Sequence, residues 1–138
     1  MKDVNVAIVA ASFNGNKGAA AMLQSSIKQL WSRYGHQLNI NLMSTYPADD
    51  RRLNPYDFVK VVSCKPGKLV FLAFPLSIVF KLLSWLPPAK SLLKKNKVIR
   101  AFCECDLVID ESGVSFVDSR GPVMNLYAFV TIATPLLL

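Results

Sequence analysis

A near-continuous apolar stretch at residues 4–11, VNVAIVAA, constrains the fold of this chain more than any other feature. Valine, isoleucine and alanine would occupy both faces of a strand formed by these residues, so both faces must be covered. Strands of this kind are typical of a parallel sheet, in which helices join neighbouring strands. The sequence therefore predicts that a helix follows soon after residue 11.

The residues after this stretch carry a helical pattern. A glycine-bearing loop, SFNGNKG at residues 12–18, leads into a segment whose apolar residues recur every three or four positions. Those residues are Met22, Leu23, Ile27, Leu30, Trp31 and Tyr34. The spacing predicts an amphipathic helix, and Gly35 stands where the left-handed residue that ends a helix is expected.

The rest of the chain continues to alternate between strands and helices. Leu38, Ile40 and Leu42 alternate with polar residues, which predicts a second strand with one less buried face. The full interpretation is a strand at 36–44, a polar loop at 46–57, a strand at 58–64, a helix at 98–105, a short buried strand at 106–110 and a helix at 122–133. The predicted fold class is α/β: a Rossmann-like parallel sheet with flanking helices, formed as a single lobe by residues 1–138.

The formal net charge of +7 is unevenly distributed along the chain. Residues 58–103 contain no acidic side chain, but they contain Lys60, Lys65, Lys68, Lys81, Lys90, Lys94, Lys95, Lys97 and Arg100. Such asymmetry favours an anionic partner surface, either a membrane or nucleic acid. The KKNK cluster at residues 94–97 has no interleaved aromatic residues, so we expect no nucleic-acid partner.

The number and spacing of the cysteine and histidine residues indicate the cellular compartment and whether a metal site is expected. The chain contains three cysteines, Cys64, Cys103 and Cys105. An odd number with this spacing is not typical of a set of disulfide bonds, which indicates a reducing, cytoplasmic compartment. His36 is the one histidine, and no CxxC pair occurs. The sequence therefore predicts no metal site.

The stretch LVFLAFPLSIVFKLLSWL at residues 69–86 contains a single charge, Lys81. Its length reaches the minimum for a membrane span. Pro75 and Lys81 weigh against spanning, because a central lysine costs about 3 kcal/mol on insertion. Three interpretations stay open, in decreasing order of preference: a buried helix, a helix in the membrane interface, and a span. In the second, residues 69–100 form a membrane-interface element whose lysines contact anionic lipid.

Residues 12–18 are the first candidate ligand site. Loops at the carboxyl ends of parallel strands face the ligand crevice, and a helix N-terminus offers free N–H groups and partial positive charge. Asn14 or Asn16 could cap the helix, and Lys17 adds a cation. The pattern matches neither the dinucleotide-binding fingerprint nor the P-loop. From the residues alone, a turn that requires glycine is favoured over a ligand site.

Residues 105–121, CDLVIDESGVSFVDSRG, are the second candidate site. The predicted strand ends near Asp110 and Glu111, and its loop should leave the sheet at the same edge as the first loop, so the two loops are expected to converge. Adjacent residues on a strand point to opposite faces, so Asp110 and Glu111 should not form a catalytic dyad. Turn chemistry of the Asx type is the competing interpretation of these polar residues.

Taken together, VAIVAASFNGNKGAAAML and CDLVIDESGVSFVDSRG resemble the polysaccharide pyruvyl transferase family. Members of that family begin with an apolar strand, a loop of Asn-x-Gly-Asn-x-Gly type and a helix that starts with small residues. They later carry an Asp-Leu-Val-Ile segment followed by Ser-Gly, Phe and Asp. The matching positions are Asn14, Gly15, Asn16, Gly18, Ala19, Asp106, Leu107, Val108, Ile109, Ser112, Gly113, Phe116 and Asp118. The resemblance runs through nearly the whole chain.

The resemblance implies an enzyme of exopolysaccharide biosynthesis that transfers the pyruvyl group of phosphoenolpyruvate to sugar hydroxyls as a ketal, without a further cofactor. The fold that it implies is the N-terminal lobe of a two-lobed, GT-B-like transferase, with the catalytic residues unassigned and expected mainly in the second lobe. The ligand-binding residues are then Asn14, Gly15, Asn16, Lys17, Gly18, Glu111, Ser112, Gly113 and Asp118. The chain departs from the family at Lys17 or its neighbour, where an acidic residue is frequent, and at Glu111, which has no fixed counterpart.

The resemblance also implies partners and a location. The acceptor is a sugar or polysaccharide, lipid-linked in some members, and the protein is cytoplasmic or peripheral at the inner membrane face. Residues 133–138 read as the beginning of another buried strand, so we expect a chain truncated before its second lobe, with little transferase activity alone. Two alternatives stay open: a non-catalytic module that binds a nucleotide or sugar phosphate, and a small membrane-interface protein.

Overall fold

The computed structural model describes residues 3–14, 17–82, 91, 94–112 and 121–138. The elements within these residues are β1 (Val4–Val9), α1 (Lys17–Tyr34), η1 (Gly35–Gln37), β2 (Leu38–Ser44), α2 (Pro47–Leu53), β3 (Val59–Ser63), α3 (Pro66–Lys68), η2 (Leu69–Ala73), α4 (Phe74–Leu82), α6 (Lys97–Cys103), β4 (Leu107–Asp110) and α7 (Gly121–Leu137). Of the short elements, η1 is a 3-10 turn and η2 is a π-helical turn.

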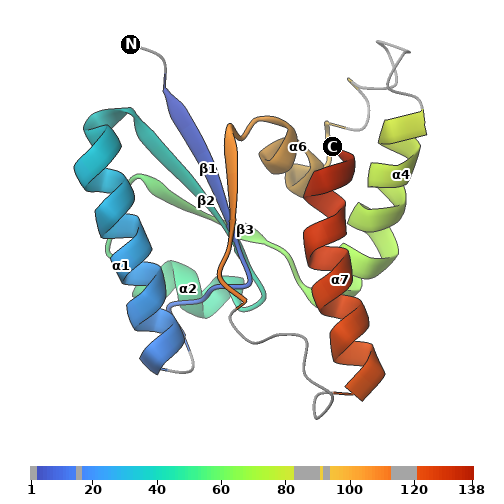
Figure 1. The fold of residues 1–138 in the computed structure, drawn as a ribbon, viewed down its shortest axis with the longest axis horizontal. Helices are drawn as coiled ribbons and strands as arrows, with labels where there is room; N and C mark the ends of the chain where they lie inside the picture. Colours follow the sequence, from blue (N-terminus) through green and yellow to red (C-terminus); the bar gives the residue numbers. More distant parts are fainter. Residues whose placement is uncertain (1–2, 15–16, 83–90, 92–93, 113–120) are drawn as a thin grey trace.

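The four strands are parallel and form one open sheet in the order β3-β2-β1-β4 (Figure 1). β1 lies inside the sheet, where Val9 is paired with Met43 of β2 on one side and with Asp110 of β4 on the other. The chain runs from β1 outward to β3 and then crosses to the far side of β1. The predicted α/β class with a parallel sheet is confirmed, and the strand order is compatible with a Rossmann-like fold.

Helices cover both faces of the sheet, as the apolar character of β1 requires. α1 covers one face, and α4, α6 and α7 cover the other (Figure 1). Val6 and Ile8 of β1 share a core with Leu23 of α1, whereas Ala7 and Val9 belong to the core on the opposite face. Right-handed connections that run in opposite directions across a parallel sheet lie on opposite faces, which accounts for this division.

The predicted first helix and its glycine stop are confirmed. α1 ends at Tyr34, and Gly35 follows with a φ of +54°. Glycine adopts this left-handed conformation without steric cost, which is why it stops the helix here. His36 lies exposed in the turn before β2, with its ring edge-on to Trp31 at a centroid distance of 5.3 Å.

The alternation predicted for the second strand is also confirmed. Leu38, Ile40 and Leu42 of β2 are buried in the core that α1 covers. Asn39 and Asn41 are half-buried on the other face. The helices predicted near residues 98–105 and 122–133 are α6 and the longer α7.

The prediction of a polar loop at residues 46–57 is wrong, because α2 occupies most of this segment. The sequence carries the signals of a helix: Pro47 stands in the first turn, Asp49 and Asp50 lie near the positive N-terminal end, and Arg51 and Arg52 lie near the other end. A helix of two turns shows almost no apolar periodicity, so a reading based on periodicity overlooks it.

The strand predicted at 106–110 is confirmed as β4, but its expected burial is wrong, and the strand expected from residue 133 onward is wrong altogether. β4 lies at the edge of the described sheet, and Leu107 is 44% exposed. An apolar run looks alike in a sequence whether or not a neighbouring strand covers it. Residues 133–137, expected to begin another strand, form the last turns of α7, where the Thr134 hydroxyl donates to the Val130 carbonyl at 2.7 Å.

The apolar stretch at residues 69–86 is helical as far as residue 82, and residues 83–86 lie outside the described residues. η2 and α4 continue one another here, with Leu69 and Ala73 in the core and Phe71 and Leu82 exposed. The interpretation as a buried helix is therefore right for one side of the helix and wrong for the other. Among the helices that the structure describes, none combines the length and apolar character that a membrane span requires.

Exchange of Gly35 for alanine tests the helix stop. No atom lies within 4 Å of a Cβ added at Gly35, so the effect should come from the positive φ alone. We expect Gly35→Ala to lower the free energy of unfolding by about 1 kcal/mol. Gly67 has equal space without a positive φ, so Gly67→Ala should leave stability unchanged or raise it slightly. Urea denaturation followed by circular dichroism measures both, and equal losses would contradict this explanation.

Candidate functional site

The loops after β1 and β4 leave the sheet side by side at one edge. Val9 is paired with Asp110, and the Glu111 N–H donates to the Val9 carbonyl at 3.1 Å. The chain order changes direction between β1 and β4, and such a switch point is where open parallel sheets bind ligands. The predicted convergence is confirmed for the described ends of both loops. Four predicted site residues lie outside the described residues: Gly15, Asn16, Gly113 and Asp118.

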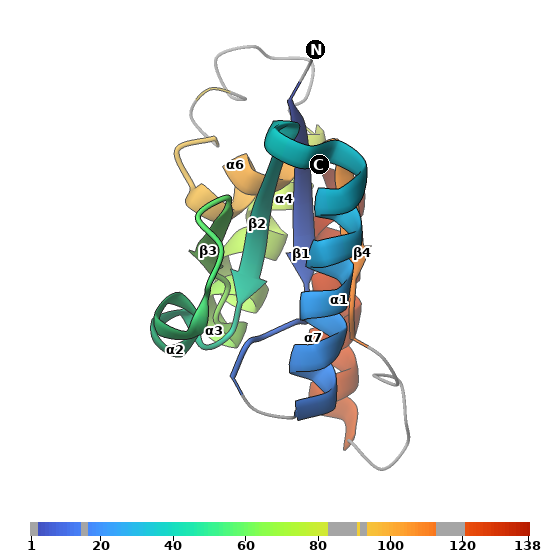
Figure 2. The same ribbon diagram turned by 90° about the vertical axis from the view of Figure 1, so that its left-hand side faces the viewer.

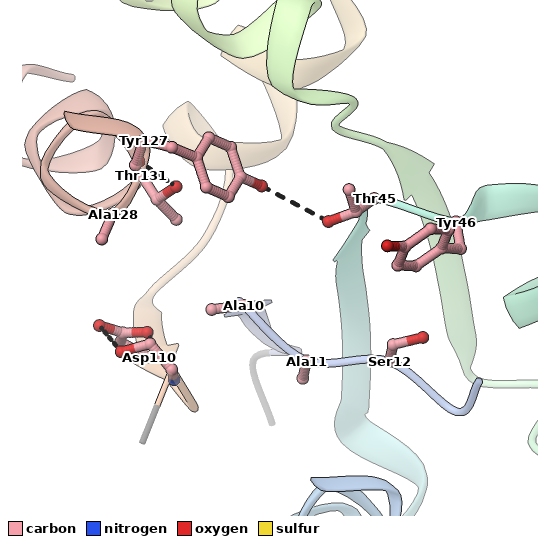
Figure 3. A pocket seen from close by; sticks show the side chains of 10 residues that line it. Ala10, Ala11, Ser12, Thr45, Tyr46, Asp110, Tyr127, Ala128 and Thr131 are labelled. Atoms are coloured by element: carbon pink, nitrogen blue, oxygen red, sulfur yellow. Dashed lines mark hydrogen bonds between the residues drawn. The ribbon is translucent and has the colours of Figure 1, made fainter. Parts of the chain in front are cut away.

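A cavity of about 200 Å³ lies at this switch point (Figure 3). Four parts of the chain supply its lining: Ala10, Ala11 and Ser12 after β1, Thr45 and Tyr46 after β2, Asp110 and Ser112 at the end of β4, and Tyr127, Ala128 and Thr131 of α7. Small-molecule sites commonly measure about 300–1000 Å³. The cavity lies below this range, which favours a small ligand over a nucleotide.

Hydroxyl groups dominate the polar lining of the cavity. The hydroxyl oxygens of Tyr127 and Thr45 lie 3.4 Å apart and link α7 to the end of β2 (Figure 3). The Thr131 hydroxyl donates to the Tyr127 carbonyl at 2.8 Å, which leaves its oxygen able to accept. Asp110 is the charged residue of the lining, which contains no lysine, arginine or histidine among the described residues. This chemistry suits a neutral ligand with several hydroxyls better than a phosphate.

Asp110 is held in place by the turn that it begins. One carboxylate oxygen accepts the Ser112 N–H at 2.9 Å, and the other accepts the Ser112 hydroxyl at 3.0 Å. This is the Asx-type turn that the sequence offered as the competing interpretation. Both residues also line the cavity, so the turn and a ligand site are compatible.

The backbone beside the cavity is strained at Ala10, which has a φ of +58°. A left-handed conformation costs an alanine about 1 kcal/mol and persists only where the surroundings hold it. Ala10 connects the end of β1 to Ala11 and Ser12, which line the same cavity. The strain therefore lies where the chain turns from the sheet into the site.

The fully buried carboxylate of Asp50 holds the loop after β1. Its Oδ1 accepts the Ser12 hydroxyl at 2.7 Å, the Phe13 N–H at 2.7 Å and the Asn14 N–H at 3.2 Å. Its Oδ2 accepts the hydroxyl of Ser44 at the end of β2. No cation pairs with Asp50 in the part of the chain that the structure describes, so hydrogen-bond donors alone satisfy it. These hydrogen bonds tie the loop to β2 and α2. Figure 2 shows the backbone of the three segments at the same end of the sheet.

The first loop contributes less to the cavity than the sequence predicted. Asn14 is exposed, and its side-chain amide donates to the Asp49 carboxylate at 3.0 Å. Lys17 and Gly18 are exposed at the start of α1 and do not line the cavity. Ser112 is the predicted site residue that the described structure places in the lining.

Glu111 points away from the cavity, toward α1, as alternation along a strand requires. Its side chain is buried, and neither carboxyl oxygen has a hydrogen-bond partner among the described residues. Burial raises the pKa of the Glu111 carboxyl above its ordinary value, and the Ser26 hydroxyl on α1 counteracts this only in part. The expectation that Asp110 and Glu111 form no dyad is confirmed.

Sequence reasoning missed most of the lining. No motif in the sequence around Thr45 indicates a ligand site. Tyr127 and Thr131 belong to a segment for which the sequence predicts only a helix. Asp50 had a usable signal in its place after Pro47, in the first turn of a short helix. Nothing in the sequence indicates that this carboxylate is buried.

Cysteine chemistry and metal binding find little support among the described residues. Burial raises the pKa of the Cys64 thiol to about 12, so it is a poor nucleophile. Burial also raises the pKa of Cys105. Within the described ranges, no group of three or more His, Cys, Asp or Glu side chains could hold a metal ion.

The fold and the cavity define a class of protein: an α/β domain with an open parallel sheet and a hydroxyl-lined cavity at its switch point. No family model matches the sequence, and neither a curated protein nor a solved structure matches it.

Removal of the Asp50 carboxylate should destabilise the loop after β1. Asp50→Ala leaves the buried Phe13 N–H and the Ser44 hydroxyl without their acceptor, so we expect the free energy of unfolding to fall by about 3 kcal/mol. Asp49→Ala is the matched control, since the Asp49 side chain is 45% exposed and should contribute less than about 1 kcal/mol. Urea denaturation compares the two variants, and similar losses would argue against the clamp.

Glu111→Gln tests the cost of the buried carboxyl. Because burial raises the folded-state pKa of Glu111, the folded state favours the protonated form, and stability is lost as the pH rises through that pKa. We expect the variant, which cannot ionise, to be more stable than the wild type at neutral pH. The difference should shrink at pH values below about 4.3, the ordinary pKa of glutamate. Denaturation curves across this range provide the measurement, and a difference independent of pH would refute the assignment.

Proposed function

We propose that residues 1–138 form the N-terminal lobe of a polysaccharide pyruvyl transferase-like enzyme with a GT-B-like arrangement of lobes. The observation that carries the proposal is the switch-point cavity. Both segments that resemble the family contribute to it, residues 6–23 through Ser12 and residues 105–121 through Asp110 and Ser112. We assign the cavity to the sugar acceptor.

The lining favours the acceptor over the donor. Phosphoenolpyruvate carries a phosphate and a carboxylate, which proteins usually hold with arginine or lysine. The described lining offers hydroxyls that both donate and accept, from Thr45, Tyr127 and Thr131, together with the Asp110 carboxylate as an acceptor. Sugar hydroxyls require this mixture. The rings of Tyr46 and Tyr127 add flat apolar surface beside it.

The proposed reaction needs the acceptor to present two hydroxyl groups. Each hydroxyl oxygen loses its proton and bonds to C2 of phosphoenolpyruvate. One proton adds to the methylene carbon, which becomes a methyl group, and the other leaves with the phosphate as the bond between C2 and the phosphate oxygen breaks. Asp110, held by its turn with Ser112, would orient one acceptor hydroxyl. The donor site and the catalytic groups are assigned to a second lobe.

The proposal places the enzyme in the cytoplasm, at the inner membrane face where lipid-linked sugars are found. The reducing compartment indicated by the three cysteines supports the cytoplasmic side.

Ligand-detected NMR with neutral monosaccharides, phosphoenolpyruvate and inorganic phosphate tests the acceptor assignment. We expect weak sugar binding, lost in Ala128→Trp because the indole fills the cavity. Asp110→Asn should weaken it about tenfold, since a charged hydrogen bond is lost. Met22→Trp is the control, because Met22 is exposed on α1, outside the cavity lining.

Two outcomes would overturn this assignment. Sugar binding that survives Ala128→Trp would place the acceptor elsewhere. Phosphate binding that is lost in Lys17→Ala and kept in Ala128→Trp would favour the non-catalytic phosphate-binding module, acting through the start of α1.

A further inference from the structure

One side of the helical unit formed by α3, η2 and α4 is apolar and uncovered. Its exposed apolar residues, here called the outer stripe, are Phe71, Leu72, Pro75, Ile78, Val79 and Leu82. They recur every three or four positions and therefore share one side of the helix, opposite Leu69, Ala73 and Phe80 in the core. Phe71 is 83% exposed and Leu82 is 70% exposed. A contiguous stripe of this kind marks an interaction surface.

The apolar surface continues from the outer stripe onto α7, which packs beside α4 (Figure 1). The rings of Phe74 on α4 and Phe129 on α7 meet with centroids 6.5 Å apart. Leu126, Phe129 and Leu136 of α7 are exposed, and this helix contains no charged residue. The uncovered surface therefore extends over two neighbouring helices.

A groove rich in cations adjoins the outer stripe. Two hollows of about 300 and 370 Å³ share Val62 of β3 and Lys97 of α6 and together form this basic groove. Its charged lining consists of Arg51, Lys60, Lys68, Lys97, Arg100 and Glu104. Leu72 of the outer stripe lines the same groove, so the cations and the apolar residues belong to one surface.

The cations of the basic groove are largely uncompensated. Within the described residues, Lys60, Lys68, Lys97 and Arg100 form no ion pair. Arg51 donates to the Val61 carbonyl at 3.5 Å. Glu104 is the single carboxylate among the described residues of the lining, and residues 58–103 contain no acidic side chain. The groove therefore presents net positive charge to its partner.

We propose that this face docks on an anionic phospholipid bilayer, with the outer stripe at the level of the acyl chains and the groove cations on lipid phosphates. Apolar residues bordered by lysine and arginine are the composition with which interfacial helices bind such membranes. A second copy of the chain is a poorer occupant, because two chains that each carry +7 repel one another. The proposal uses none of the cavity residues and does not rest on the proposed function.

Co-sedimentation with lipid vesicles tests the proposal. The 138-residue chain is mixed with vesicles of phosphatidylcholine alone or of phosphatidylcholine with phosphatidylglycerol, at low and high salt. We expect partition into the anionic vesicles at low salt, weaker at about 1 M salt, where screening shortens the reach of surface charges to about 3 Å. Lys68→Gln should weaken partition about fivefold, the contribution of one cation near the membrane. Phe71→Ser should weaken it about tenfold through lost apolar burial.

Matched controls separate docking from general effects of charge and stability. Lys28→Gln and Met22→Ser change exposed residues of α1, on the opposite face of the sheet, and should leave partition unchanged. Circular dichroism checks that each variant is folded. The proposal is overturned if the wild type stays in the supernatant at low salt, or if the controls lose as much binding as Lys68→Gln and Phe71→Ser. It is also overturned if an oligonucleotide displaces the chain from vesicles, or if the chain dimerises instead of partitioning.

Discussion

The Asp50 carboxylate joins three segments that the hydrogen bonds of the sheet leave separate. It accepts hydrogen bonds from the loop after β1 and from Ser44 at the end of β2, while its own backbone belongs to α2. A buried carboxylate is costly unless donors surround it, and here Oδ1 accepts three hydrogen bonds and Oδ2 accepts one. Because the loop is anchored in this way, the strained Ala10 and the neighbouring Ser12 keep fixed positions beside the cavity. The rest of the site is built against this anchored loop.

The two chemically distinct surfaces of the lobe are kept apart by the sheet topology. The cavity lies at the carboxyl ends of β1 and β4 and is lined by hydroxyls and one carboxylate. The basic groove lies along β3 and α6 and shares no residue with the cavity. Under the two proposals, the cavity holds a neutral acceptor and the other face contacts anionic lipid. An acceptor that is itself linked to lipid would require both surfaces, so the two proposals are compatible although each stands alone.

The errors of the sequence analysis share a physical cause. The residues of α2 look like a loop in the sequence because a helix of two turns has almost no apolar periodicity. Pro47 and the acidic and basic residues at the two ends nevertheless indicate a helix. β4 and residues 133–137 are apolar runs in the sequence. Whether such a run becomes a core strand, an edge strand or a helix depends on which neighbouring elements bury it, and the run alone does not specify them. The outer stripe follows the same rule: residues 69–82 are apolar on both sides, and tertiary packing covers only one of them.

The sequence by itself determined the local order of this protein: a doubly covered strand, a glycine-stopped helix and an alternating strand, which together require a parallel sheet. Hydrophobic periodicity and the φ of Gly35 are local properties, so they can be read from neighbouring residues. The tertiary structure decided which side chains meet. One cavity is lined by Thr45, Asp110 and Tyr127 because the strand order places β4 beside β1, and because α7 lies next to the ends of these strands. That order depends on long-range packing, which no local pattern encodes.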